Sequence, residues 1–139
     1  MSLAINSSDS SYTEGVISSQ VEGIIDVMNR KADEVEERLR QEETEANEFI
    51  NLLNDPVGRL TVMPFFSVSE YNKELDAKIV EIRQGITKME FFRDQVNREE
   101  AVPPSLKGRL IQAVDRTIKC GERALEMNNR IKRALQSRG

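Results

Sequence analysis

Hydrophobic residues recur at alternating steps of four and three through residues 14–54. This spacing is that of the a and d positions of a coiled coil, and it continues for more than four heptads. The segment is therefore predicted to be one long helix. Glu42 interrupts the series, either as a polar layer that sets the register or as the point where packing against a partner helix ends. The other positions are Val21, Ile25, Met28, Ala32, Val35, Leu39, Ala46, Phe49 and Leu53.

Two later segments repeat this hydrophobic period and predict helices over residues 67–99 and 105–137. Ser67, with Glu70 three residues later, fits the capping box that begins a helix, and Ser105 is expected to cap the third one. Short connections between three helices favour an up-down-up arrangement. We therefore expect an all-α fold, an antiparallel three-helix bundle with coiled-coil-like packing and a long first helix. The two series comprise Val68, Leu75, Ile79, Ile82, Ile86, Met89 and Val96, then Leu110, Val114, Ile118, Leu125, Ile131 and Leu135.

Composition along the chain defines the domain. Residues 1–13 are polar, rich in serine and aperiodic, which predicts a disordered tail. Residues 14–139 suit a single helical-bundle domain. The sequence contains no run of about 18 apolar residues, so no membrane span is expected. It has no secretory signal pattern and only one cysteine, Cys120, and on these grounds we expect a cytoplasmic protein.

The connection at residues 55–66 combines two prolines with several apolar residues, and it is predicted to be extended rather than helical. Two interpretations remain open. In the first, the connection packs into the groove between the first two helices through Leu60, Val62, Phe65 and Phe66. In the second, it is an exposed docking strip, because a large apolar patch on a surface favours contact with another protein. That strip consists of Val62, Met63, Phe65 and Phe66.

Charged residues are sorted along the chain. Residues 1–55 carry a net charge of −9, residues 56–99 are neutral, and residues 100–139 carry +5, which accounts for the total of −4. This distribution either holds an acidic first helix against a basic third helix or presents differently charged faces to partners. We expect the basic end to face the acidic helix, an anionic membrane surface or a protein partner, and no nucleic acid, because no aromatic residue for base stacking lies in it. Its candidate binding residues are Arg130, Lys132 and Arg133.

The residue types that carry chemistry are largely missing. The chain contains no histidine, which removes the commonest general base and transition-metal ligand. Cys120 has no second thiol or imidazole with which to form a zinc site, and it is expected to be a partly buried structural thiol. Glutamate pairs such as Glu36 and Glu37 are expected to be solvated, and the glycines form no phosphate-binding loop. We therefore expect no enzymatic activity, no cofactor and no metal.

The second half of the chain contains two stretches with the pattern of a known family. FFSVSEYNKELDAKIVEIRQGITKM has a phenylalanine pair, Phe65 and Phe66, before an I-R-x-x-I step, and LIQAVDRTIKCGERALEMNNRIKRALQ follows it. These stretches resemble the first and second helices of the N-terminal regulatory three-helix (Habc) region of syntaxin-type SNAREs, over residues 65–137. The family's third regulatory helix, fusion motif and membrane anchor have no counterpart in this sequence. The resemblance implies a regulatory bundle that folds back on a fusion helix and binds a Sec/Munc-type regulator.

These observations favour a non-catalytic protein–protein interaction module that binds a helical partner in a groove or through coiled-coil contacts. With the resemblance, the expected role is a regulatory domain in SNARE-type membrane trafficking, at the cytoplasmic face of a membrane. The alternative is a secretion-associated helical chaperone or effector domain of a bacterial system, in which the acidic helix covers a segment of its partner. Either role is compatible with a homo-oligomer.

Overall fold

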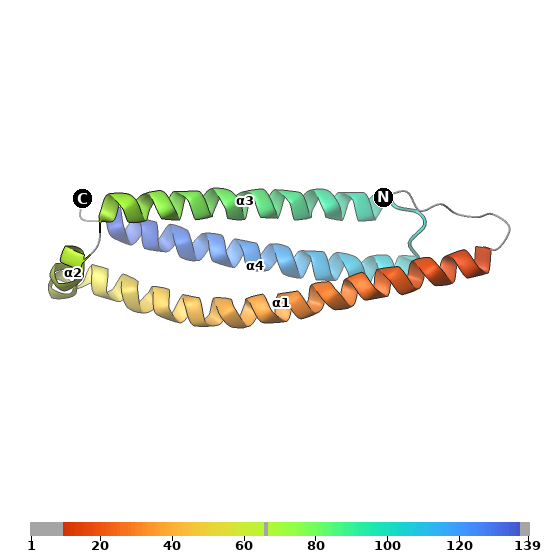
Figure 1. Cartoon of the computed structure of the whole chain (residues 1–139), viewed down its shortest axis with the longest axis horizontal. Coiled ribbons are helices and arrows are strands. Elements are labelled where there is room, and N and C mark those ends of the chain that lie inside the picture. Colours follow the sequence, from red (N-terminus) through yellow and green to blue (C-terminus); the bar gives the residue numbers. More distant parts are fainter. Residues whose placement is uncertain (1–9, 66, 137–139) are drawn as a thin grey trace.

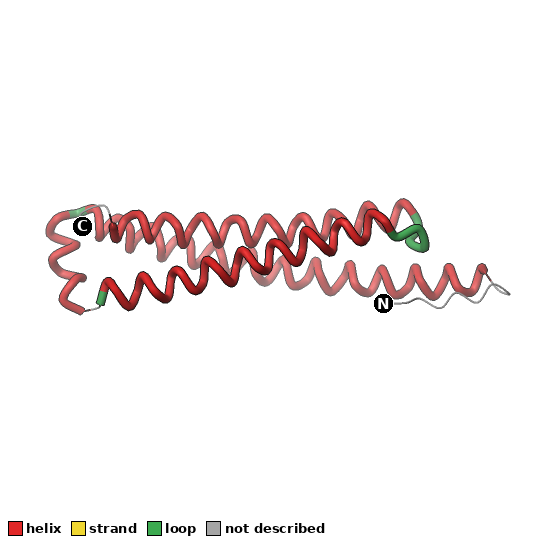
Figure 2. Tube along the Cα trace, turned by 90° about the horizontal axis from the view of Figure 1, so that it is seen from above, coloured by secondary structure: helices red, strands yellow, loops and turns green. Residues whose placement is uncertain are grey.

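The computed structural model describes residues 10–65 and 67–136, apart from the side chains of residues 10–14 and 65. The elements are α1 (Ser10–Asn54), α2 (Pro56–Val62), the 3-10 helix η1 (Met63–Phe65), α3 (Val68–Arg98) and α4 (Pro104–Gln136). No strand occurs in the described residues (Figure 1, Figure 2). The predicted all-α class is therefore confirmed for this part of the chain.

The three long helices lie side by side, and α4 contacts both α1 and α3. The backbones of α1 and α3 approach each other much less, although side chains of the two helices meet, as the rings of Phe49 and Tyr71 do. The colours of Figure 1 show that α1 and α4 run in the same direction and α3 in the opposite one. The short α2 lies across one end of the long helices, between the end of α1 and the start of α3 (Figure 2). The central helix is thus α4, and its buried residues accordingly recur along its whole length.

The heptad series of α1 shows how this helix packs. Every seventh residue from Ile25 to Leu53 is buried, whereas the alternate positions of the series are only half-buried. α1 makes its main contact with α4, and a helix with one main neighbour buries a narrow seam. One side of the α1 seam therefore rests on α4 and the other side is partly open. The half-buried residues are Met28, Val35, Glu42 and Phe49.

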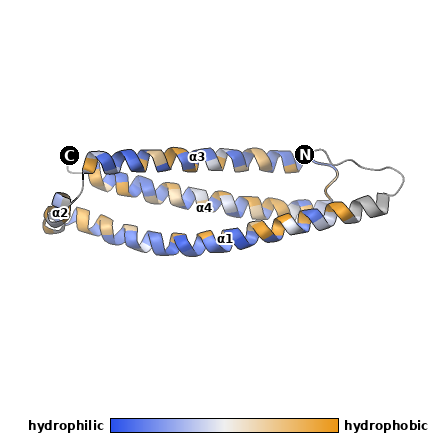
Figure 3. Cartoon of the chain, in the orientation of Figure 1, coloured by the Kyte–Doolittle hydropathy of each residue, from blue (hydrophilic) through white to orange (hydrophobic). Residues whose placement is uncertain are grey.

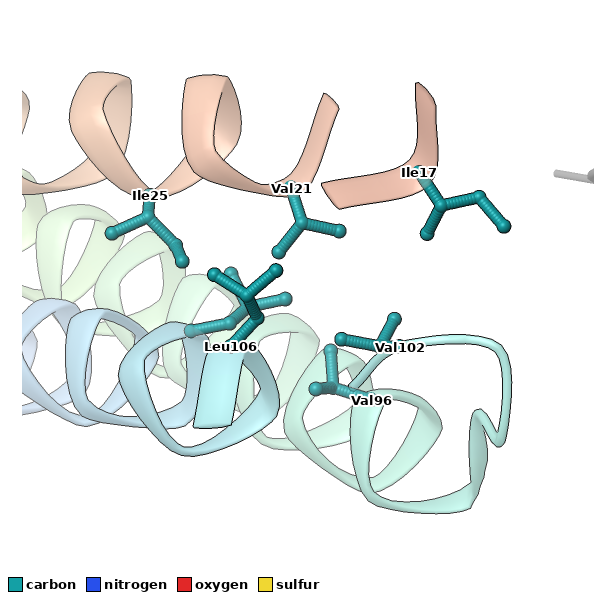
Figure 4. Packing of buried hydrophobic residues seen from close by; sticks show 7 residues of the cluster. Ile17, Val21, Ile25, Val96, Val102 and Leu106 are labelled. Carbon is teal, nitrogen blue, oxygen red and sulfur yellow. The ribbon is translucent and has the colours of Figure 1, made fainter. Parts of the chain in front are cut away.

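One hydrophobic cluster fills the end of the bundle next to the connection between α3 and α4. In Figure 4, the side chains of Ile17, Val21 and Ile25 of α1 lie on the side of α1 that faces Leu106, at the start of α4, and Val102, in the connection. Burial of Val102 makes the proline-containing connection a packed corner rather than a free linker. The cluster comprises Ile17, Val21, Ile25, Val96, Val102, Leu106 and Leu110.

A second hydrophobic cluster fills the opposite end, where α2 lies. Between the two clusters, α1 is mostly hydrophilic (Figure 3). In this middle part α1 buries Ala32 and Leu39, and ion pairs to α4 add to the contact. The second cluster comprises Ala46, Ile50, Leu53, Leu75, Ile131, Ala134 and Leu135.

Two predicted helix starts are wrong and one is confirmed. The helix α1 begins at Ser10, so residues 10–13 are helical rather than part of the predicted tail; residues 1–9 lie outside the described part. No proline or glycine precedes Gly15 in this turn, so nothing stops the helix there. The helix α4 begins at Pro104, which suits the first helical position because its missing N–H needs no acceptor there, and Ser105 therefore lies inside the helix. Ser67 does cap α3, since its side chain accepts a hydrogen bond from the backbone N–H of Glu70 at 3.3 Å.

The connection at residues 55–66 contains the helix α2, so the extended conformation predicted for it is wrong. Pro56 occupies the first helical position, where proline is tolerated, and it therefore ends α1 while beginning α2. Asp55 is the N-cap, and its side chain accepts a hydrogen bond from the backbone N–H of Gly58 at 2.9 Å. The segment between Pro56 and Pro64 is long enough for about two helical turns.

Candidate functional site

The α2 end of the molecule brings together the predicted docking residues that the structure describes. Val62 ends α2 and Met63 begins η1; both are half-buried, and Met63 packs against the second hydrophobic cluster. Arg130, Lys132 and Arg133 lie in the last turns of α4, which end at the same place. The side chain of Phe65 and the whole of Phe66 lie outside the described residues.

The outer face of α2 exposes apolar side chains. Leu60 is 76% exposed and Val57 is 71% exposed, the two highest values among the large hydrophobic residues that the structure describes. The interpretation in which Leu60 packs into the groove between the first two helices is therefore wrong. The reason is that α2 is a helix, and its inner face is formed instead by the buried Gly58 and the half-buried Arg59.

The inner face of α2 fits closely against the end of α1. A Cβ atom at Gly58 would lie 2.6 Å from the backbone oxygen of Leu52, a distance that real Cβ atoms do not adopt. Only glycine allows the two backbones to approach in this way. The position of α2 on α1 is therefore fixed by a backbone contact as well as by its N-cap.

Arg59 joins α2 to the end of α4. Its guanidinium donates to the backbone oxygens of Ala134 at 3.2 Å and Leu135 at 2.9 Å. A third hydrogen bond, at 3.5 Å, reaches the backbone oxygen of Leu53 in α1. The last carbonyls of a helix lack partners within the helix and carry partial negative charge, so a cation at this point stabilises the helix end. One side chain thus ties together three helices at this end.

None of the described basic residues near the end of α4 forms an ion pair with α1, so the alternative in which this end pairs with the acidic helix is wrong for them. The membrane and protein alternatives stay predictions. Lys132 pairs with Asp76 of α3, and Arg133 pairs with Glu126 within α4 at 3.1 Å. Arg130 and Arg133 instead line a shallow groove that also contains Ile50 and Asn54 of α1. This groove lies between the ends of α1 and α4, at the end of the molecule where α2 also lies.

Two arginines that the sequence prediction missed join α4 to the acidic helix. Arg116 donates to Glu36 of α1 at 3.2 and 2.5 Å, and also to Asp33. Arg123 pairs with Glu43. Both pairings of arginine with glutamate have the same separation of 80 residues, as parallel helices in heptad register require.

The heptad spacing of charged residues in the sequence could have predicted these ion pairs. Arginines recur every seven residues on α4, and two of the facing positions of α1 are glutamates separated by the same step. At the next step along α1 the residue is Ile50, which explains why Arg130 meets an apolar side chain where Arg116 and Arg123 meet acids. The arginine row consists of Arg109, Arg116, Arg123 and Arg130.

The Arg116 contact gives a pH-dependent prediction. The hydrogen bond from Arg116 lowers the pKa of Glu36 from its ordinary value of 4.5. A carboxylate with a lowered pKa stabilises the folded state above its ordinary pKa, and this contribution is lost as the pH falls through the lowered value. Arg116→Gln is therefore expected to reduce the stability at neutral pH. In urea-unfolding measurements, the difference in unfolding free energy between Arg116→Gln and the unsubstituted protein should shrink as the pH falls below 4.5.

Arg109→Gln is the matched control for this substitution, because Arg109 is exposed one heptad earlier and forms no ion pair with any residue that the structure describes. Arg109→Gln should change the stability little at any pH. Equal losses in the two variants would show that Arg116 acts only through the net charge.

Cys120, the single cysteine of the chain, lies on α4. Cys120 is buried, and burial raises the pKa of its thiol, as expected for a structural cysteine. No group of three or more acidic or cysteine side chains in the described part of the chain is arranged to hold a metal ion. None of the described helices combines the length and the apolar composition that crossing a membrane requires.

Comparisons with family models, with curated proteins and with solved structures gave no match to this chain.

Proposed function

We propose that this chain is a non-catalytic protein–protein interaction module that binds a helical partner at its α2 end. In this proposal α1, α3 and α4 form an antiparallel bundle with coiled-coil-like packing, and the bundle serves as a rigid support for α2. The expected partner surface is an apolar helix face flanked by acidic residues, because the docking surface is apolar with a basic rim.

The observation that carries the proposal is the exposure of Val57 and Leu60 on a helix that is firmly attached from its other side. Exposed apolar residues on a mobile loop would lose conformational entropy on binding, whereas α2 is already ordered by its N-cap and by the bonds of Arg59. Arg130 and Arg133 lie at the same end of the molecule as this preformed apolar helix face. This end therefore combines apolar and basic residues, as a protein-binding surface with a charged rim does.

The resemblance to syntaxins adds a more specific form of this proposal, in which the module is a regulatory domain of SNARE-type trafficking and its partner is a fusion helix or a Sec/Munc-type regulator. The secretion-associated chaperone or effector domain uses the same docking mechanism with a different partner. The identity of the captured protein separates these two roles.

The test is capture of a partner from source cells by the unsubstituted chain and by a Val57→Ser/Leu60→Ser double variant. Because both side chains are solvated in the free protein, the stability should change by no more than about 0.5 kcal/mol per site. Capture should nevertheless be lost.

Val80→Ser is the control, because Val80 is also exposed, at 52%, but lies on α3 away from α2. It should leave capture intact. Retention of the same partner by the double variant would exclude α2 as the docking surface.

A further inference from the structure

A second surface lies between α1 and α3, where the two helices do not contact each other closely. It is an open groove with a volume of about 280 Å³, and residues of α4 form its floor. The groove begins at Glu42, the residue that interrupts the heptad series of α1. The half-buried side of the α1 seam therefore becomes one wall of the groove. Its apolar surface is contributed mainly by Ala46, Phe49, Tyr71, Leu75, Met127 and Ile131.

The rim of this groove is acidic. Glu42, Glu45 and Glu74 line it, against a single cation, Lys78. Glu42 already pairs with Arg38 at 3.7 Å. Glu45 and Glu74 form no ion pair with any residue that the structure describes. Two carboxylates on opposite walls are thus available to a positively charged group from outside.

Two aromatic rings lie beside these carboxylates. Phe49 of α1 and Tyr71 of α3 have ring centroids 5.9 Å apart and planes inclined at 58°. Aromatic faces attract a cation, and arginine is the side chain most often found in such contacts. Burial raises the pKa of Tyr71, with a smaller contribution from the charge of Glu74, so the hydroxyl remains neutral.

The floor of the groove contains a buried polar side chain. Asn128 of α4 is 6% exposed, and its Nδ2 donates to the backbone oxygen of Ala124 at 2.7 Å. Its Oδ1 accepts no hydrogen bond from the described residues. Asn72 Oδ1 is the only fully buried side-chain oxygen or nitrogen without a partner in the described residues, so Asn128 Oδ1 is still reached by solvent. It can therefore accept a hydrogen bond from a donor that enters the groove.

We propose that the groove receives an arginine side chain from the helix of a protein partner. The guanidinium supplies donors for Glu45, Glu74 and Asn128, and its plane can stack on an aromatic ring. An apolar residue one turn away on the same partner helix would cover Met127. The negative charge of the rim repels a partner helix whose contacting residues are acidic. This surface is separate from α2, so it adds a second binding specificity to the module.

The test uses an alanine-rich helical peptide with one arginine and one leucine a helical turn apart, together with a peptide in which citrulline replaces arginine. The whole chain contains no tryptophan and two tyrosines, one of which, Tyr71, lines the groove, so tyrosine fluorescence and calorimetry can both follow binding. The arginine peptide should bind, and citrulline, which keeps the shape but removes the charge, should weaken binding by roughly tenfold or more. Higher salt should also weaken the arginine peptide.

Glu45→Gln and Glu74→Gln should each weaken binding of the arginine peptide by about tenfold. Glu48→Gln and Glu81→Gln remove the same charge from exposed positions of the same two helices outside the groove, and they should leave the Kd nearly unchanged. Equal binding of the two peptides, equal effects of groove and control variants, or no binding of either peptide would each overturn the proposal. The α2 variants should bind the arginine peptide normally, so this result is independent of the proposed α2 docking.

Discussion

Leu53→Ala should lower the free energy of unfolding by about 2–5 kcal/mol, the cost of removing a fully buried leucine side chain. Leu53 is 0% exposed in the cluster that joins the end of α1 to α3 and α4. The cavity would lie at the junction with α2, so the surrounding helices cannot easily close it. Since a domain of this size is stable by about 5–15 kcal/mol, a large share of the total would be lost. Urea unfolding followed by circular dichroism measures the change.

Leu52→Ala provides the control for this substitution one residue earlier in the same helix. Leu52 is 46% exposed, so truncation removes less buried surface and leaves no closed cavity. Its effect should stay below about 1 kcal/mol. If both variants lost the same stability, α1 would have to contact α4 through a different face from the one described.

Gly58→Ala should destabilise the protein by about 1–3 kcal/mol, the usual cost of overpacking. The new methyl group would meet the backbone oxygen of Leu52 at 2.6 Å, and backbone cannot rotate away as a side chain can. The helix α2 would have to shift, which would also disturb the bonds of Arg59 to the end of α4. Thermal unfolding measures the loss of stability. Hydrogen exchange of residues 56–62 should show whether it starts in α2.

Gly85→Ala is the opposite case, because nothing lies within 4 Å of a Cβ atom at this exposed position of α3. Alanine is the better helix former, so this substitution should stabilise the protein by about 0.5–1 kcal/mol. The two substitutions are chemically identical and should have effects of opposite sign. Stabilisation by both would mean that α2 does not pack against Leu52.

Gly58 and Gly85 show that a helical sequence pattern does not reveal which glycine lies against a neighbouring element. Glycine is costly inside a helix, so its presence at Gly85 favours a close approach of helices, yet the surroundings of Gly85 are open. The close approach between α3 and α4 occurs at Gly121, where a Cβ atom would lie 2.7 Å from a side-chain carbon of Ile86. Which glycine faces a neighbour depends on how two helices are rotated against each other, and one helix's sequence does not contain that information.

The candidate site was predicted only in part, for a similar reason. The sequence identified the apolar connection and the basic end of α4 as interaction surfaces, and the fold places the described residues of both at one end of the molecule. It did not predict that Val57 and Leu60 would be the exposed residues, because the proline rule suggested an extended chain and Pro56 instead begins a helix. The groove between α1 and α3 was not predicted either, although Glu42, which interrupts the heptad series, lines it.

The heptad series by itself determined the all-α class and the main buried face of each long helix, because helical periodicity is a local property of consecutive residues. It placed the ends of these helices to within about four residues. Only the tertiary structure decided which residues of different helices contact each other. The parallel register of α1 and α4 selects Arg116 and Arg123, rather than the more basic end of α4, to meet the acidic helix. The central position of α4 leaves α1 and α3 apart, and this opens the acidic groove above Asn128. Contacts of this kind depend on the offset and rotation between whole helices, which are set by packing across the entire bundle.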